Sequence, residues 1–201
     1  MKDIVEEIGR ARRQVSVEGE SATLLVRRRY DAEVEEVWDA CTDAGRLARW
    51  LAPVSGDLRL GGRYQLEGNA GGEILACEPP SLLKVTWVYG GEGSSEVEVR
   101  LAEADGGTLF ELRHAAVVPP GMWDRYGPGA VGVGWDLSLL GLAMHLAGEP
   151  QPDPESFGRS ADGARFIAAS GQAWGEAHRS SGADEEQAAS AAKNTIAFYT
   201  P

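Results

Sequence analysis

Apolar and polar residues alternate over most of the middle of the chain, as they do in β-strands with one buried face. Glycine- and proline-containing turn signals interrupt this alternation at short intervals. Together the two patterns predict six strands, over residues 56–60, 63–67, 72–77, 82–89, 95–103 and 108–117. Because short turns join consecutive strands, we expect the strands to form an antiparallel meander.

One face of the predicted sheet is apolar. Its members alternate with polar residues such as Lys84, Thr86 and Glu111. They are Leu83, Val85, Trp87, Tyr89, Val97, Val99, Leu101, Phe110, Leu112 and His114. An apolar face must be covered by another element, so the chain needs at least one helix that packs on it.

The segment from residue 130 to 147 is the longest predicted helix. One apolar stripe runs along it at helical spacing through Val131, Trp135, Leu139, Leu142 and Leu146. A second stripe runs through Val133, Leu137, Leu140 and Met144. A helix that is apolar nearly all round is buried on more than one side, so we expect one side to grip the sheet.

The residues before the meander predict a strand and three short helices. Asp31 can cap the first of two helices between residues 31 and 51, and Thr42 or Asp43 can cap the second. Alternation over residues 15–30 predicts a long first strand. Ahead of it, apolar residues at helical spacing predict a short amphipathic helix within residues 1–14.

The last fifty residues predict two amphipathic helices. The first carries Phe166, Ala169, Ala173, Trp174 and Ala177 on one face. The second begins at Asp184, with Gln187 as a capping partner, and presents Ala189, Ala192, Ile196 and Tyr199. The predicted organisation is therefore an N-terminal helix over 1–14, a domain over 15–148, and a helical extension over 149–201 that packs on the domain or on a second subunit.

Six blocks of sequence carry a resemblance to a known superfamily: VEEVWDACTD, ARWL, LGGRY, ILACEPPSLLKVTW, TLFELRH and GVGWDLSLLGL. In this order they resemble the START-like (SRPBCC) superfamily, and within it the group named for the activator of the heat-shock protein 90 ATPase. The resemblance implies an α+β helix-grip fold, in which a curved antiparallel sheet wraps around a long C-terminal helix. It also implies an apolar cavity between the sheet and that helix.

Composition limits the classes of partner. The chain has 201 residues and a formal charge of −12, which argues against nucleic acid as a partner. The run Arg27–Arg29 is divided between two faces by strand alternation. We expect no membrane insertion, and no disulfide between Cys41 and Cys77, because neither has a cysteine neighbour at motif spacing. These features predict a cytoplasmic protein.

No catalytic or metal-binding motif is recognisable in the sequence. His114, His145 and His178 are isolated from one another, and no nucleophile elbow, phosphate loop or dinucleotide fingerprint is present. We therefore predict no metal, no cofactor and no catalytic set. His114 at the end of a strand is either a donor or base in a cavity, or a histidine satisfied by a backbone carbonyl.

Aromatic residues are the strongest candidates for a binding site. The predicted cavity lining is Trp50, Tyr64, Trp87, Tyr89, Phe110, His114, Trp135 and Leu139. These side chains either line a ligand pocket or fill a solid core. The segment 115–130, which contains Met122, Trp123 and Tyr126, is either a gate to the pocket or an ordered connector anchored by its aromatics.

Three functions follow from these features and from the resemblance. The first is a protein that binds an apolar or aromatic small molecule in the cavity. The second is a cyclase or aromatase type of enzyme, with His114, Tyr64 and Tyr89 as its acid–base groups. The third is a chaperone cofactor of the stress response, as the group's name implies. A homodimer is compatible with all three.

Overall fold

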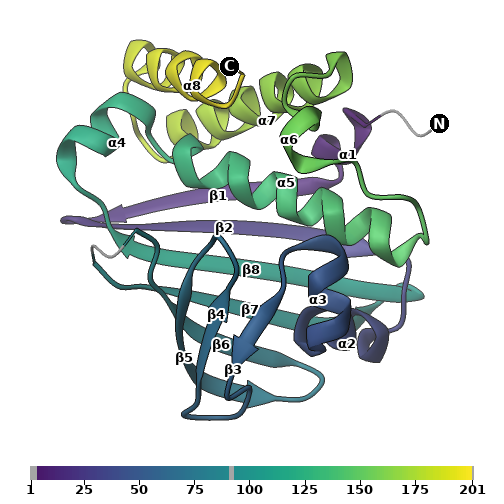
Figure 1. Cartoon of the computed structure of the whole chain (residues 1–201). Coiled ribbons are helices and arrows are strands. Elements are labelled where there is room, and N and C mark those ends of the chain that lie inside the picture. Colours follow the sequence, from purple (N-terminus) through teal and green to yellow (C-terminus); the bar gives the residue numbers. More distant parts are fainter. Residues whose placement is uncertain (1–3, 91–92, 201) are drawn as a thin grey trace. The chain divides into compact units, whose positions relative to one another are not determined.

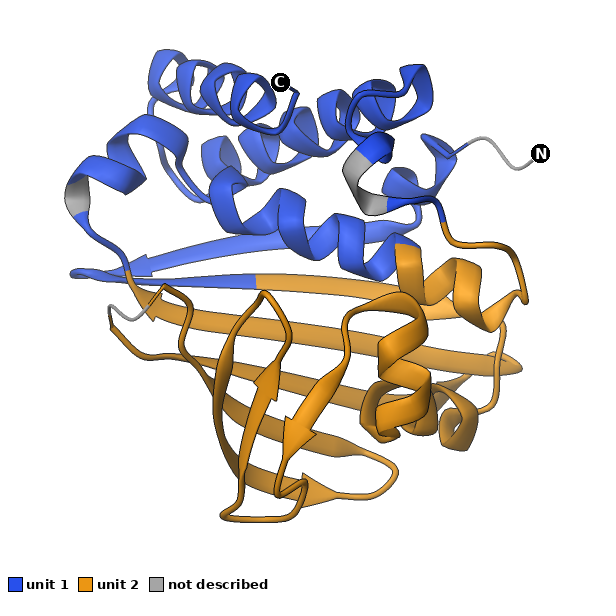
Figure 2. Cartoon of the chain, in the orientation of Figure 1, with its two compact units in different colours: residues 1–24, 118–140, 152–201 blue, residues 25–117, 141–151 orange. Residues whose placement is uncertain are grey.

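The computed structural model describes residues 4–90 and 93–200. Within them the chain is α+β, with eight strands in one sheet in the order β1-β2-β8-β7-β6-β5-β4-β3 (Figure 1). The predicted class and the antiparallel meander are confirmed. Figure 2 shows two compact units: unit 1 comprises residues 1–24, 118–140 and 152–201, and unit 2 comprises residues 25–117 and 141–151.

The meander forms most of unit 2. Its strands are β3 (Val54–Gly56), β4 (Arg63–Leu66), β5 (Gly71–Glu78), β6 (Leu82–Trp87), β7 (Ser95–Ala104) and β8 (Gly107–Val117). They pair in sequence order, each antiparallel to the next. The strand predicted over 56–60 is wrong, because β3 ends at Gly56 and residues 57–62 form a turn. That turn is held against β5 by Gly61 N donating to Ile74 O at 2.9 Å.

Two short helices precede the meander, as predicted. They are α2 (Val34–Thr42) and α3 (Ala44–Trp50). Asp43 caps α3, because its carboxylate accepts from Arg46 N at 2.8 Å. Asp31 does not cap α2; Glu33 occupies that position without a side-chain bond. β2 (Ser21–Tyr30) leads into α2, and its alternation separates buried Arg28 from exposed Arg27 and Arg29, as predicted.

The N-terminal part of unit 1 differs from the prediction. Helix α1 spans only Glu6–Gly9, and strand β1 (Ala11–Glu18) begins within the segment predicted to be helical. The single long strand predicted over 15–30 is a hairpin of β1 and β2. Gly19 has a φ of 62°, a conformation that glycine adopts readily and that turns the chain back between the two strands.

The remainder of unit 1 is helical. Its elements are α4 (Pro120–Tyr126), the first part of α5 (Gly129–Leu146), α6 (Pro154–Phe157), α7 (Ala161–Ser180) and α8 (Glu185–Tyr199). Asp184 caps α8 as predicted, accepting from Glu186 N and Gln187 N. The predicted buried face of α8 is wrong by one position, since Ala188, Ala191 and Thr195 are the buried residues.

The segment predicted as a gate is a structured connector. Residues 120–126 form α4 rather than an open loop. The ring of Trp123 meets that of His178 edge to face at 5.2 Å between centroids. Asn194 and Thr195 of α8 donate to the carbonyls of Arg125 and Tyr126 at 2.9 and 3.0 Å. The alternative of an ordered connector anchored by its aromatics is therefore the better description.

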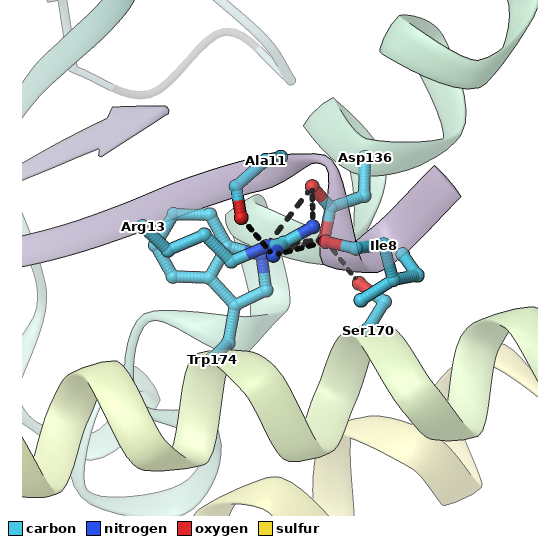
Figure 3. A network of polar contacts seen from close by, with 6 residues as sticks. All are labelled: Ile8, Ala11, Arg13, Asp136, Ser170 and Trp174. Atoms are coloured by element: carbon cyan, nitrogen blue, oxygen red, sulfur yellow. Dashed lines mark hydrogen bonds and ion pairs between the residues drawn. The ribbon is translucent and has the colours of Figure 1, made fainter. Parts of the chain in front are cut away.

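A buried polar network joins four elements of unit 1 (Figure 3). Asp136 on α5 accepts from Arg13 on β1, with Nη2–Oδ1 at 2.9 Å. Ser170 Oγ and Trp174 Nε1, both on α7, donate to Asp136 Oδ2 at 2.5 and 3.0 Å. Arg13 Nη1 donates to the carbonyls of Ile8 and Ala11. The Arg13 and Asp136 side chains are 5% and 2% exposed, so this is a fully buried ion pair.

Helix α5 also has the length and mean hydropathy of a membrane span, 18 residues at 1.3. It is the one such helix in the described part of the chain. Core helices share both properties, and Asp136 in the middle of α5 is engaged by Arg13. The composition of α5 is therefore weak evidence for a membrane segment.

Candidate functional site

The strongest candidate site is the apolar face of the sheet in unit 2, which we call the inner face. Strand register defines it, because residues directly opposite each other in an antiparallel pair point to the same side. Val85 pairs with Val97, and Val97 pairs with His114. Extending these pairs by steps of two gives Tyr64, Ile74, Leu83, Val85, Trp87, Ser95, Val97, Val99, Leu101, Phe110, Leu112 and His114.

Exposure varies across the inner face. On β8, Phe110 and Leu112 are 2% exposed and His114 is 6% exposed. On β6 and β7, by contrast, the inward-pointing Leu83, Trp87 and Val99 are only half-buried. Val85, Val97 and Leu101 on the same two strands are 4–8% exposed. Solvent therefore reaches the apolar face of β6 and β7 in places, at Leu83, Trp87 and Val99, whereas Phe110, Leu112 and His114 of β8 are buried.

A short hydrogen-bond chain lies at one end of the inner face. Ser95 Oγ donates to the carbonyl of Trp87 at 2.8 Å, and His114 Nε2 lies 2.8 Å from the same Oγ. A hydroxyl has one hydrogen, which points to Trp87 O, so Nε2 must carry a proton and donate to Ser95. The rings of Trp87 and His114 are 6.4 Å apart in a T-shaped arrangement. Ser95 is thus not activated as a nucleophile by His114.

Burial lowers the pKa of His114 from 6.5 to about 4. The unfolded chain gains this proton near pH 6.5, but the folded chain gains it only near pH 4. Neutral His114 therefore makes its full contribution to the free energy of unfolding above pH 6.5, and this contribution is lost as the pH falls toward 4. Each unit by which the pKa is lowered corresponds to about 1.4 kcal/mol, so the free energy of unfolding should fall by roughly 3 kcal/mol over this pH range.

We expect a His114→Gln variant to lose less stability between pH 7.0 and pH 4.5 than the wild-type chain. Glutamine can still donate to Ser95 but does not titrate in this range. Urea unfolding of both proteins at the two pH values measures the difference. The contributions of the other acid-sensitive groups are the same in both proteins and cancel in the comparison. Equal losses in the two proteins would mean that His114 is not a desolvated, neutral histidine.

Two predicted site residues use their polar groups within the fold. Tyr64 Oη donates to Thr86 O at 2.7 Å, and burial raises the pKa of its phenol. Trp50 Nε1 donates to Ala40 O at 2.8 Å, which ties α3 to α2. Tyr64 therefore lies on the inner face as an uncharged phenol, and Trp50 holds two helices together.

The remaining predicted residues are distributed differently from the expectation. Phe110 lies on the part of the inner face that β8 contributes, and its ring meets that of Tyr30 edge to face at 5.7 Å. Tyr89 is 67% exposed, because β6 ends at Trp87 and the alternation does not continue past it. Its assignment to the lining is therefore wrong. Trp135 and Leu139 lie on α5 in unit 1, and their part in a lining stays a prediction.

Sequence reasoning missed one residue that matters for the site. Ser95, at the first position of β7, was not recognised as the partner of His114. The strands predicted over 82–89 and 95–103 would place Tyr89 opposite Ser95, so the pairing of Trp87 with Ser95 follows only from the folded chain. Among the described residues no group of three or more histidine, cysteine or acidic side chains is placed to hold a metal ion.

Comparison with known proteins identifies a family whose model matches this chain. The family model described as "Activator of Hsp90 ATPase homolog 1-like protein" matches residues 31–147, more than half of the chain. A search of the curated proteins finds no match to this chain.

Solved structures with similar folds include CalU16 from Micromonospora echinospora. Its crystal structure is 38% identical, with a TM-score of 0.65, over 84% of this chain and 98% of that one. Its solution structure is 39% identical, with a TM-score of 0.71, over 85% and 96% of the two chains. DynU16, described as a protein in the dynemicin biosynthetic locus, is 25% identical, with a TM-score of 0.56, over 64% of this chain and 48% of that one.

Proposed function

The chain belongs to the family of activator of Hsp90 ATPase homolog 1-like proteins, and from that premise we propose that it binds an apolar or aromatic small molecule on its inner face. The proposed contacts are Trp87, Phe110 and the half-buried Leu83 and Val99. Tyr64 and His114 supply uncharged polar groups at the margins of this surface. Aromatic walls with a few placed polar groups are typical of small-molecule sites.

One observation carries the proposal: solvent reaches part of the apolar inner face. In a solid core the inward-pointing Leu83, Trp87 and Val99 would be as buried as Phe110 and Leu112. A ligand that covers this apolar area removes it from water, and this stabilises the complex by about 25 cal/mol for each Å² covered.

The comparisons support a ligand from small-molecule biosynthesis. DynU16 is described as a protein in a biosynthetic locus, and its likeness covers 64% of this chain. The enzyme alternative has less support, because Nε2 of His114 is engaged by Ser95 and the Tyr64 phenol by Thr86 O. Stimulation of a chaperone ATPase stays a prediction from the family's name.

We expect a Leu83→Trp variant to bind the apolar dye Nile red at least 10-fold more weakly than the wild-type chain. The larger side chain would fill the accessible part of the inner face. Fluorescence titration measures the affinity. Arg113→Trp is the matched control, because Arg113 is exposed on the outer face of β8 and a tryptophan there leaves the inner face unchanged.

Two outcomes of this titration would contradict the proposal. Wild-type chain that binds no dye at micromolar concentration would leave the inner face without a ligand function. Equal loss of binding in both tryptophan variants would place the dye elsewhere. Thermal unfolding of each variant checks that the fold is retained.

A further inference from the structure

The outer side of the α7–α8 pair carries an open groove of about 480 Å³. Its lining divides into a floor of small and apolar residues and a rim of longer polar ones. The floor is Gly175, Ala188, Ala189, Ala192 and Ile196, and the rim is Gln172, Glu176, Arg179, Glu185 and Lys193. All of these residues belong to unit 1, and nothing in the proposed small-molecule site involves them.

Small residues bring the two helices close together beneath this groove. A Cβ added to Gly171 would lie 2.5 Å from Ile196 Cγ1, and one added to Gly175 would lie 2.9 Å from Ala192 Cβ. Larger residues at these positions would push the helices apart. The close approach leaves an open groove with a floor of helix backbone and short side chains, and an open surface of this kind suits contact with another helix better than enclosure of a small molecule.

The charges of the rim distinguish the groove from the rest of the chain. Glu176 and Glu185 are balanced by Arg179 and Lys193, whereas the whole chain has a formal charge of −12. A net charge of this size makes two copies repel one another at long range, so a contact between copies needs a surface that adds no local repulsion. The four charged residues of the groove sum to zero, so the groove adds no local repulsion to such a contact.

The rim charges are also free to change partners. Arg179 Nη2 lies 2.5 Å from Glu176 Oε1 within the same helix, but both side chains are more than half exposed, at 52% and 61%. Exposed ion pairs of this kind contribute little to folding. Facing a second copy, the acidic residues of one groove would meet the basic residues of the other, and a two-fold axis makes each such contact twice.

The size of the surface agrees with a weak, specific dimer. α7 has 20 residues and α8 has 15, so they are about 30 Å and about 22 Å long. Two helices side by side, each about 10 Å across, offer a face of about 500–600 Å². Two such faces would bury about 1,000–1,200 Å², near the lower limit for stable specific interfaces.

We propose that the α7–α8 groove binds the same groove of a second copy of the chain, giving a two-fold symmetric four-helix contact. The occupant is a second copy because the groove is self-complementary in charge and is bordered by two long helices. A dimer of this size should be concentration-dependent, with a dissociation constant in the micromolar range.

Sedimentation velocity of the full chain between about 1 and 200 μM tests the proposal. We expect the mass to rise from that of one chain, 21.4 kDa, toward twice that value. Ala189→Arg should keep the chain monomeric, because Ala189 is an exposed residue of the groove floor. Ser190→Arg is the matched control: it adds the same charge to the next residue of α8, which is exposed and does not line the groove.

Each alternative outcome overturns the proposal. A chain that stays monomeric throughout the concentration range leaves the groove to another partner. A dimer that Ala189→Arg leaves unchanged uses another surface. If circular dichroism shows that Ala189→Arg does not fold, Lys193→Glu makes the same test through an exposed rim residue, and it should weaken the dimer at least 10-fold.

Discussion

Replacing Asp136 with alanine is expected to lower the free energy of unfolding by about 3–5 kcal/mol, the usual cost of breaking a buried ion pair from one side. Arg13 would stay buried with an uncompensated charge, since its side chain is 5% exposed. Ser170 Oγ and Trp174 Nε1, both in fully buried residues, would lose the oxygen to which they donate. Urea unfolding followed by circular dichroism measures the change.

A double variant separates the charge effect from the packing effect. In Arg13→Met, Asp136→Leu both charges are removed and apolar volume is retained, so much of the lost stability should return. Ser170 and Trp174 would still lack an acceptor, so recovery should be incomplete. A single variant that loses less than about 1 kcal/mol would contradict the description of this network as fully desolvated.

Replacing Phe110 with alanine is expected to destabilise the chain by about 3–5 kcal/mol, as large-to-small changes of buried aromatics do. Phe110 is 2% exposed, packs edge to face on Tyr30 and lies opposite Leu101 across the β7–β8 pair. Leu109→Ala is the matched control. Leu109 is the preceding residue of the same strand, points to the other face and is 39% exposed, so its loss should cost less than about 1 kcal/mol.

Urea unfolding of these two variants tests the assignment of faces directly. A shift of one residue in the β7–β8 register would exchange the two positions and reverse the order of the effects. Comparable destabilisation by Phe110→Ala and Leu109→Ala would mean that both faces of β8 are covered. That result would contradict the definition of the inner face on which the site depends.

The parts of the fold that sequence predicted well are those with an uninterrupted pattern. β6, β7 and β8 alternate over six to eleven residues, so their faces followed from period alone. The cap at Asp184 followed from local chemistry, and so did Asp43 as one of two candidates with Thr42, because an N-cap depends on its own side chain and the next three residues.

The missed features depend on contacts between residues distant in sequence, or on shifts of pattern. Val15 and Val17 occupy odd positions, whereas Ala22, Leu24 and Val26 occupy even ones, and this change of parity marks the β1–β2 turn at Gly19. Tyr89 continued an alternation that the strand itself does not continue. Asp136 lies alone in an apolar helix, which signals a buried partner but does not identify Arg13, 123 residues away.

The sequence predicted part of the candidate site, namely which residues share a face but not how exposed each one is. Tyr64, Trp87, Phe110 and His114 share one face because strand register carries their positions across the sheet. Their differences in exposure do not follow from alternation, because exposure depends on which elements cover each strand. Alternation placed Leu83 and Val99 on the apolar face, but that they are only half-buried could be seen only in the folded chain.

The central claim, that the inner face binds an apolar small molecule, is tested most directly by native mass spectrometry of freshly purified chain beside a denatured sample. We expect a mass above 21.4 kDa under native conditions that returns to the chain mass on denaturation and is absent from Leu83→Trp. The added mass would identify the ligand class. Two results would contradict the claim. One is an adduct that Leu83→Trp retains. The other is a bare chain mass together with no stabilisation by added apolar compounds in thermal unfolding.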